Sequence, residues 1–395
     1  MSTENTGQVL YRLLAAWIHG TEFDPTETPD FEALFQMANR HLLSAAVCAA
    51  LEKTGLMADC PPETAKRFRA AKEKSMRKTI LMDAERKELL AFFEQQGIWY
   101  APLKGVVLNT LYPQYGVRQF SDNDIFFDAA YGRTVRGHMR SRGYTVESIG
   151  KGAHDSYQKL PVYRFEMHRK LFSDDGKGGF LSSCVDYYTD ARKRLFKDDN
   201  NRFGYHFSDE DFYIYILAHA FKHYSGGGTG LRTLLDAYLY RHHKTALNES
   251  YVAGELEKLG LSEFEAVSRS LGEKLFSLAP CLKFTADEAA MLDWMDSSGT
   301  YGTVSHHVES NLRTIQQTRG VTEKHSRWIY LFRKVFPPMD WYRANAPFAY
   351  RHRWAVPFFW IYRLFRGVFK NRKRNFMILK MLCNTQDGSY VGKRT

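Results

Sequence analysis

The sequence has few cysteines, and none of them is in a spacing typical of a disulfide framework or a zinc site. The five cysteines are scattered and form no CxxC pair, which excludes the disulfide-rich secreted class and the zinc-cage class. The N-terminus lacks a basic segment followed by an apolar run, so no secretory signal is visible, and no internal repeat occurs. We therefore expect a cytoplasmic protein, with attachment to the periphery of a membrane as the alternative.

Acidic residues are almost absent from the last part of the chain. Residues 324–395 carry 16 Lys and Arg against two acidic residues, a net charge of +14, while the whole chain has a net charge of +11. The rest of the chain is therefore slightly acidic, at −3. A uniformly basic body would favour general nucleic-acid binding, whereas one basic appendix indicates a local contact with phosphate or anionic lipid.

Long apolar runs are also missing. A mostly apolar segment of the C-terminal part, residues 354–365, contains Arg363 and is flanked by Arg351, Arg353 and Arg366, and it is shorter than the roughly 20 residues that span a bilayer. Its mixture of aromatic and basic residues is compatible with an anionic membrane surface, with stacking on RNA, or with a helix packed on the body of the protein. The sequence leaves these three alternatives open.

The hydrophobic pattern predicts an α+β fold with a small mixed-sheet core embedded between helical regions. With 395 residues, of which 44% are hydrophobic, the chain is long enough for two or three structural units. We expect an N-terminal helical region over 1–97, an α/β core over 98–205, a helical domain over 206–323, and a basic aromatic tail over 324–395.

Within these regions, the period of the apolar residues locates the individual elements. Strands are predicted at 98–103, 122–128, 143–147, 156–160 and 162–168, with helices at 105–112 and 131–142 between them. Outside the core, helices are predicted at 61–96, 208–226, 231–242, 248–259, 262–275 and 286–297.

Two carboxylates on one predicted strand are the most informative feature. Residues two apart on a strand point to the same side, so Asp122 and Asp124 project together while Asn123 and Ile125 face the opposite side. Mg²⁺ prefers one or two carboxylates together with phosphate oxygens and water. The pair therefore predicts a site for a metal–nucleotide complex, in which phosphate charge is neutralised during transfer.

Basic residues upstream and an acid downstream fit the same site. Lys104 and Gly105 lie where a strand gives way to a helix, a place suited to phosphate, and Arg118 offers a second positive group. In residues 163–168 the apolar and polar side chains alternate, which leaves Glu166 on the polar face. We expect Glu166 to be a metal ligand or the general base that accepts a proton from an acceptor hydroxyl.

At these residues the chain resembles the uncharacterised nucleotidyltransferase family of the polymerase-beta-like nucleotidyltransferase superfamily. The resemblance is carried by Leu103-Lys104-Gly105, Tyr112-Pro113, Arg118, Asp122-x-Asp124-Ile125 and Glu166-Met167-His168, and by flanking helical segments with His41, His219, His223, Arg232 and Asp236, over about residues 35–245. Two departures stand out: Asn123 replaces an apolar residue between the acids, and Lys-Gly stands where most of the superfamily has Gly-Ser.

The resemblance implies a nucleotidyltransferase core, dependence on Mg²⁺ with Mn²⁺ as the alternative, and transfer of a nucleoside monophosphate from a nucleoside triphosphate such as ATP. It implies no particular acceptor. We place the metal on Asp122, Asp124 and Glu166, and the nucleotide near Lys104, Gly105 and Arg118.

Three histidines are candidates for the mouth of the site. His168 lies on the polar strand face beside Glu166, and His219 and His223 are four residues apart on a predicted helix. That spacing can hold zinc, but no HExxH glutamate accompanies it, which favours helix packing or contact with the site. The alternative to an enzyme is a catalytically inactive nucleotide-binding or interaction module with the same fold.

Overall fold

The structure is a computed structural model that describes residues 5–23, 25, 28–150, 152–173, 179–369 and 372–383. It divides into two compact units: the first is formed by the chain up to Lys222 together with Thr229–Thr300, and the second by His223–Gly228 together with the chain from Tyr301 onward. Residues 370, 371 and 384–395 of the predicted basic tail lie outside the described residues. The predicted division into four regions stays a prediction.

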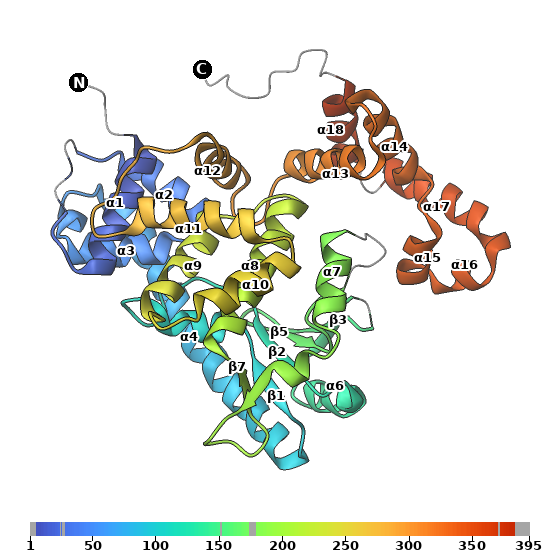
Figure 1. The fold of residues 1–395 in the computed structure, drawn as a ribbon, viewed down its shortest axis with the longest axis horizontal. Coiled ribbons are helices and arrows are strands. Elements are labelled where there is room, and N and C mark those ends of the chain that lie inside the picture. Colours follow the sequence, from blue (N-terminus) through green and yellow to red (C-terminus); the bar gives the residue numbers. More distant parts are fainter. Residues whose placement is uncertain are drawn as a thin grey trace. The chain divides into compact units, whose positions relative to one another are not determined.

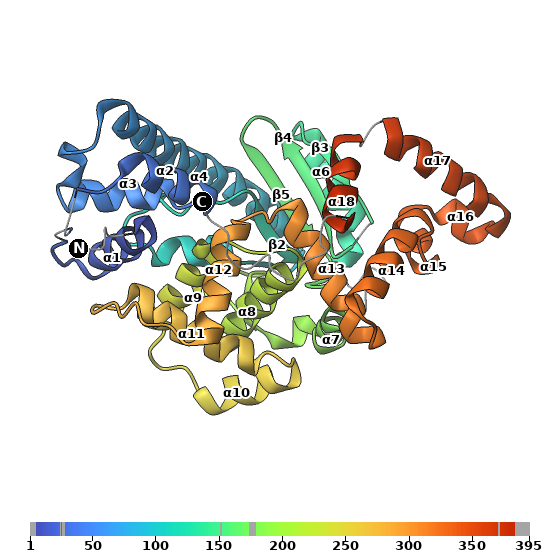
Figure 2. The same ribbon diagram turned by 90° about the horizontal axis from the view of Figure 1, so that it is seen from above.

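The first unit opens with three short helices that pack with one long helix. These are α1 (Thr6–His19), α2 (Phe31–Arg40), α3 (Ser44–Lys53) and α4 (Pro62–Gln96). Buried residues of α4 recur at three, four or seven positions, as in Phe68, Ser75, Thr79, Met82, Leu89 and Phe93, so one stripe of the helix faces the protein. Figures 1 and 2 show α4 running from α2 and α3 to the sheet.

The sheet of the first unit has five strands in the order β1-β2-β5-β4-β3. The strands are β1 (Tyr100–Pro102), β2 (Asn123–Phe127), β3 (Thr145–Ser148), β4 (His154–Lys159) and β5 (Tyr163–His168). Only β2 and β5 pair in parallel, and the other three pairs are antiparallel. This mixed sheet, set among helices, confirms the predicted α+β class.

One face of the sheet is covered by α4 and by α6 (Gly132–Ser141). The buried core on this face contains Leu89 and Phe93 of α4, Val135 and Met139 of α6, and the strand residues Ile125, Phe127, Tyr157, Phe165 and Met167. Because side chains alternate along a strand, the residues between these apolar positions point to the opposite face. Asp124 of β2 and Arg164, Glu166 and His168 of β5 therefore lie on the other side of the sheet.

The remaining elements of the first unit follow the predicted order closely. They are α5 (Gly105–Leu108), α7 (Phe180–Tyr187), the β6–β7 hairpin (Leu195–Lys197 and Tyr205–Phe207), α8 (Asp209–Gly226), α9 (Leu231–His243), α10 (Glu249–Lys258), α11 (Ser262–Phe276) and α12 (Ala286–Ser298). Helix α8 continues from the first unit into the second. The pattern of the sequence did not indicate α7 or the small hairpin.

The second unit is helical in its described part. Its elements are α13 (Val304–Arg319), α14 (Glu323–Val335), α15 (Met339–Asn345), α16 (Pro347–Arg351), α17 (Val356–Phe369) and α18 (Arg372–Cys383). Two small buried clusters hold it together, one around Tyr342 and Ala349 and one around Val308 and Ile378. Across the described ranges of both units, every helix is too short or too polar to traverse a bilayer.

Candidate active site

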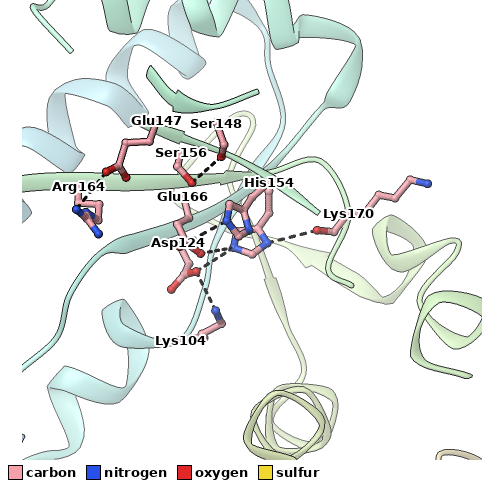
Figure 3. A network of polar contacts seen from close by, with 10 residues as sticks. Lys104, Asp124, Glu147, Ser148, His154, Ser156, Arg164, Glu166 and Lys170 are labelled. Atoms are coloured by element: carbon pink, nitrogen blue, oxygen red, sulfur yellow. Dashed lines mark hydrogen bonds and ion pairs between the residues drawn. The ribbon is translucent and has the colours of Figure 1, made fainter. Parts of the chain in front are cut away.

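Parallel pairing of β2 with β5 places two of the predicted acidic residues side by side. Asp124 lies opposite Glu166 in the register, and both point away from the face that buries Ile125 and Met167. The side chain of Asp124 is 5% exposed and that of Glu166 is 24% exposed. Figure 3 shows the two carboxylates on the same side of the sheet, with Lys104 approaching from below. The cluster is thus buried at Asp124 and open to solvent at Glu166.

Two positive groups meet the Asp124 carboxylate. Lys104 Nζ donates to Asp124 Oδ1 at 2.8 Å, and His168 Nε2 donates to the same oxygen at 2.9 Å. Burial alone would raise the pKa of Asp124, but Lys104 and His168 outweigh it and hold that pKa below its ordinary value. In the same way, hydrogen bonds to Asp124 and Glu166 raise the pKa of His168 against the effect of its burial. Asp124 is therefore ionised and bound to cationic groups.

Asp122 lies directly before β2 and is electrostatically linked to the other two acids. Burial, followed by repulsion from Asp124 and Glu166, raises its pKa to about 6. Neighbouring carboxylates repel one another unless positive charge lies between them. The donor set fits a divalent cation, because carboxylates provide the hard oxygen ligands that Mg²⁺ or Mn²⁺ would bind.

The segment that delivers Asp122 is anchored by helices on both sides. From α4, Ser75 Oγ donates to Gly116 O at 2.7 Å, and Lys78 Nζ donates to Phe120 O and Ser121 O at 2.8 and 2.9 Å. Arg232 of α9 donates to Gln119 O. Burial lowers the pKa of Lys78, although the nearby Asp122 opposes that effect. These contacts hold the backbone next to Asp122 in place, although Asp124 and Glu166 repel the Asp122 carboxylate.

The surroundings of Asn123 explain the first departure from the family pattern, a polar residue between the two acids. Its side chain faces α4, where Nδ2 donates to Met82 O at 3.2 Å and Oδ1 accepts from Arg86 Nη1 at 3.2 Å. The buried amide is therefore paired with partners on α4, as a buried polar group requires. A polar residue is accommodated between the two acids without disturbing the side that carries Asp124.

The Lys104 turn adopts a conformation that is rare for a residue with a side chain. Lys104 has φ 42° and ψ −103°, and such a conformation costs on the order of 1–3 kcal/mol, so it persists only where neighbouring contacts impose it. The N–H of Leu103 donates to Asp124 O at 2.9 Å, and the carbonyl of Lys104 begins α5. Helix α5 has only four residues before a 3-10 turn, so the α-helix is shorter than predicted.

Arg118 lies beside this turn in a buried ion pair. Its Nε and Nη2 donate to the two carboxylate oxygens of Asp236, both at 2.8 Å, and Tyr112 Oη donates to Asp236 Oδ1 at 2.8 Å. Its third nitrogen, Nη1, is buried and has no hydrogen-bond partner among the residues that the structure describes, and it lies 3.3 Å from where a Cβ on Gly105 would stand. The resemblance residues Tyr112, Arg118 and Asp236 thus form one buried network that joins the site to α9, and the role of Arg118 toward a nucleotide stays a prediction.

Of the three histidines predicted for the mouth, the structure brings His168 into the centre of the site. His219 lies one turn beyond Tyr215 on α8, with ring centroids 6.4 Å apart, while His223 is exposed. Tyr215 itself is buried next to the charges of Lys104 and Asp124, and burial raises its pKa. The mouth assignments of His219 and His223 stay predictions.

Sequence reasoning missed His154. In the antiparallel pairing of β4 with β5, His154 lies opposite His168, and its Nε2 is 3.5 Å from Glu166 Oε1. Burial lowers the pKa of His154 although Glu166 opposes that shift. The signal that would have found it is the short turn at 160–162, because a tight hairpin there sets residues 154 and 168 opposite each other.

The fold and the site define a class: an α+β protein in which two parallel strands, β2 and β5, carry acidic residues side by side. Residues 27–277 match the family model described as "Uncharacterised nucleotidyltransferase". The match covers more than half of the chain, so this protein belongs to the uncharacterised nucleotidyltransferase family, and membership supports a transferase that performs nucleotidyl transfer. Neither the curated proteins nor the solved structures contain a match to the chain.

Proposed function

We propose that the protein is a metal-dependent nucleotidyltransferase that moves a nucleoside monophosphate from a nucleoside triphosphate such as ATP to an acceptor hydroxyl. The observation that carries the proposal is that Asp124 and Glu166 are register partners on β2 and β5, with Asp122 directly before β2, and that burial, followed by repulsion from Asp124 and Glu166, raises the pKa of Asp122 to about 6. We assign Mg²⁺ as the metal, with Mn²⁺ as the alternative. Mg²⁺ held by these residues would neutralise charge on the triphosphate.

Each residue of the cluster has a distinct proposed role. Asp122 and Asp124 hold the cation, and Glu166, the most exposed of the acids that β2 and β5 contribute, holds a second cation or accepts the proton of the acceptor hydroxyl. Lys104 binds the phosphates once a cation replaces it as the partner of the Asp124 carboxylate. Gly105 allows the phosphates to approach the backbone, and Arg118 Nη1 is the group aimed at this turn.

A transfer assay separates this enzyme from an inactive module with the same fold. The full chain is incubated with Mg²⁺, each α-³²P-labelled nucleoside triphosphate, and fractions of small molecules, RNA and proteins as acceptors. We expect pyrophosphate release together with label on one acceptor class. Nucleotide binding without pyrophosphate release in every fraction would instead support the catalytically inactive nucleotide-binding or interaction module.

Lys104→Met is predicted to have opposite effects on the two ligands. Lys104 Nζ and His168 Nε2 both donate to Asp124 Oδ1 in the structure, so removal of Lys104 takes away one of the two donors that compete with a cation for this oxygen. Mg²⁺ alone should then bind about tenfold more tightly. Binding of Mg²⁺ with a non-hydrolysable triphosphate should weaken by about tenfold or more, since a charge-assisted phosphate contact is lost. Isothermal titration measures both affinities.

The control for this variant is Lys193→Met, which removes a lysine whose side chain is 79% exposed and paired with Asp190. It should change neither affinity. A parallel loss of Mg²⁺ and nucleotide binding in Lys104→Met would show that Lys104 only supports the fold, and it would remove Lys104 from the nucleotide site.

We further propose that the second unit binds the surface of an anionic membrane. One face of α17 packs through Phe359 and Trp360 on the cluster around Tyr342, while the opposite face is exposed. Its exposed apolar residues follow helical spacing: Phe358, Ile361, Tyr362, Phe365 and Phe369. A helix that is apolar on both sides requires a second apolar environment.

Charge and side-chain type favour lipid over RNA as that environment. The stretch 324–395 has a net charge of +14, which attracts any anionic surface. However, the exposed set also includes aliphatic side chains, namely Ile361, Leu364, Met377 and Leu379. Aliphatic groups enter the acyl boundary of a membrane but cannot stack on bases. The protein would then be a cytoplasmic enzyme held at the membrane periphery.

Removal of two aromatic anchors on α17 is predicted to release the protein from membranes. The variant Phe358→Ser with Phe365→Ser should lower sedimentation with phosphatidylserine-containing vesicles by about tenfold or more, because each lost ring withdraws apolar area from the lipid. The matched control is Ile80→Ser with Leu278→Ser, which changes equally exposed apolar residues of the first unit. Binding to single-stranded RNA with no binding to these vesicles would overturn the membrane proposal.

A further inference from the structure

Two histidines and one glutamate form a compact set of metal-ligand atoms at one end of β4 and β5. The ligand atoms of His154, Glu166 and His168 all lie within 4.8 Å of one another. His154 Nε2 is 3.5 Å from Glu166 Oε1, and His168 Nε2 is 3.7 Å from Glu166 Oε2. A cation with bonds of about 2.0–2.2 Å holds neighbouring ligands roughly 3–4 Å apart. Small side-chain adjustments would therefore bring all three onto one ion.

The strand register explains why these side chains meet. His154 is the antiparallel partner of His168, and Glu166 is two residues from His168 on the same face of β5. The centroids of the His154 and His168 rings are 4.9 Å apart. The side chains of His154 and Glu166 are 29% and 24% exposed, so solvent ions have access. Figure 3 shows His154 and Glu166 facing each other above Asp124.

The hydrogen bonds of His168 have the pattern found in metal-binding histidines. Its Nδ1 is 3.3 Å from the carbonyl oxygen of Lys170, an atom that can only accept, so Nδ1 donates. A metal-bound imidazole commonly donates its other N–H to a backbone carbonyl in this way. Nε2 then faces Asp124 Oδ1 at 2.9 Å and Glu166 Oε2 at 3.7 Å. Two carboxylates around that nitrogen require positive charge there, which either a proton or a metal ion supplies.

We propose that His154, Glu166 and His168, sharing Asp124 with the carboxylate site, form a mixed nitrogen–oxygen site that selects Mn²⁺ or another first-row transition ion over Mg²⁺. The proposal rests on the proposed function, because it identifies the ion at the Glu166 position of that site. Imidazole nitrogen binds transition ions more strongly than Mg²⁺, which prefers oxygen ligands and retains its water. The chain would then hold two different cations side by side, one on oxygen ligands and one on nitrogen and oxygen.

Pulsed electron paramagnetic resonance of Mn²⁺ bound to the metal-free full chain tests this site without reference to activity. Bound Mn²⁺ should show modulation from ¹⁴N, the signature of imidazole ligands, in the presence of a large excess of Mg²⁺. In His154→Ala the ¹⁴N modulation should decrease and Mn²⁺ affinity should fall by about tenfold or more. The matched control is His206→Ala, which removes an exposed histidine that also pairs with a carboxylate, Asp198, and it should change neither quantity.

Mn²⁺ that binds the wild-type chain without ¹⁴N modulation overturns the mixed site, as does equal Mn²⁺ affinity in His154→Ala and His206→Ala. Nucleotidyl transfer with Mg²⁺ would in that case still stand, since Asp122 and Asp124 provide it. Conversely, ¹⁴N-coupled Mn²⁺ in a chain that binds no nucleoside triphosphate would support the mixed site and reject the proposed function.

Discussion

Asp122→Asn is expected to lower nucleotidyl transfer by about a hundred- to a thousandfold, because it removes a carboxylate that would hold the Mg²⁺ whose charge neutralises the triphosphate during transfer. The same variant should be more stable than the wild type without metal. Burial, followed by repulsion from Asp124 and Glu166, raises the pKa of the Asp122 carboxyl to about 6, and a neutral amide removes both the buried charge and the repulsion. We expect a rise in melting temperature of roughly 2–4 °C at pH 8.

The pH dependence of this stabilisation has a defined sign. The pKa of Asp122 is raised on folding from its ordinary 3.8, so the ionised side chain opposes folding above the folded-state pKa. The gain in Asp122→Asn should therefore be complete above pH 6 and disappear below the ordinary value, where the carboxyl is protonated in both states. Melting curves across this pH range provide the measurement.

The control is Asp190→Asn, a change at a carboxylate that is 67% exposed, which should alter neither transfer nor stability. Addition of Mg²⁺ should raise the melting temperature of the wild type more than that of Asp122→Asn, because binding to the folded state stabilises it. If Asp122→Asn instead retained transfer and responded to Mg²⁺ like the wild type, Asp122 would not be a metal ligand.

Asp236→Ala is expected to destabilise the first unit by about 3–5 kcal/mol, the cost of leaving a buried charge without its partner. Arg118 and Asp236 are 5% and 8% exposed in their side chains and form a two-pronged pair. Removal of the carboxylate also leaves Tyr112 Oη without its acceptor. Urea unfolding of the full chain, followed by circular dichroism, measures the loss.

Glu249→Ala provides the comparison, because it breaks an ion pair with Arg241 in which Glu249 is 59% exposed. Such a pair contributes about 0–1 kcal/mol. The apolar double variant Arg118→Met with Asp236→Leu should recover much of the stability lost in Asp236→Ala, since neither buried charge remains. Equal losses in Asp236→Ala and Glu249→Ala would contradict the assignment of a buried pair.

Local pattern was sufficient to place most elements of the first unit. Alternation along residues 122–128 and 162–168 predicted which side chains share a face, and β2 and β5 show that alternation. The sequence also indicated where helices end. A glycine after a helical stretch predicts a helix end, and Gly97 ends α4 in the left-handed conformation. These features depend on neighbours in the sequence, so the sequence alone contains the information.

Long-range pairing could not be read in the same way. Arg118 and Asp236 are 118 residues apart, and no periodicity indicates that they meet. The approach of Lys104 to Asp124 depends on a backbone with φ 42° at a non-glycine residue, which sequence pattern does not favour. His154 becomes part of the site only through the register of β4 with β5.

The prolines of the C-terminal part lie at the starts of helices. Pro338 immediately precedes α15, Pro347 is the first residue of α16, and Pro357 is the second of α17. Proline is favoured at the first turn of a helix, where its missing N–H would have no partner. Pro338, Pro347 and Pro357 therefore mark where successive short helices begin.

Isothermal titration of the full chain with a non-hydrolysable nucleoside triphosphate, with and without Mg²⁺, tests most directly whether the three acids form a metal–nucleotide site. We predict binding that requires Mg²⁺ in the wild type and is lost in Asp122→Asn. Equal affinity with and without Mg²⁺, or no binding of any of the four triphosphates in its presence, would contradict the assignment of Asp122, Asp124 and Glu166 to that site.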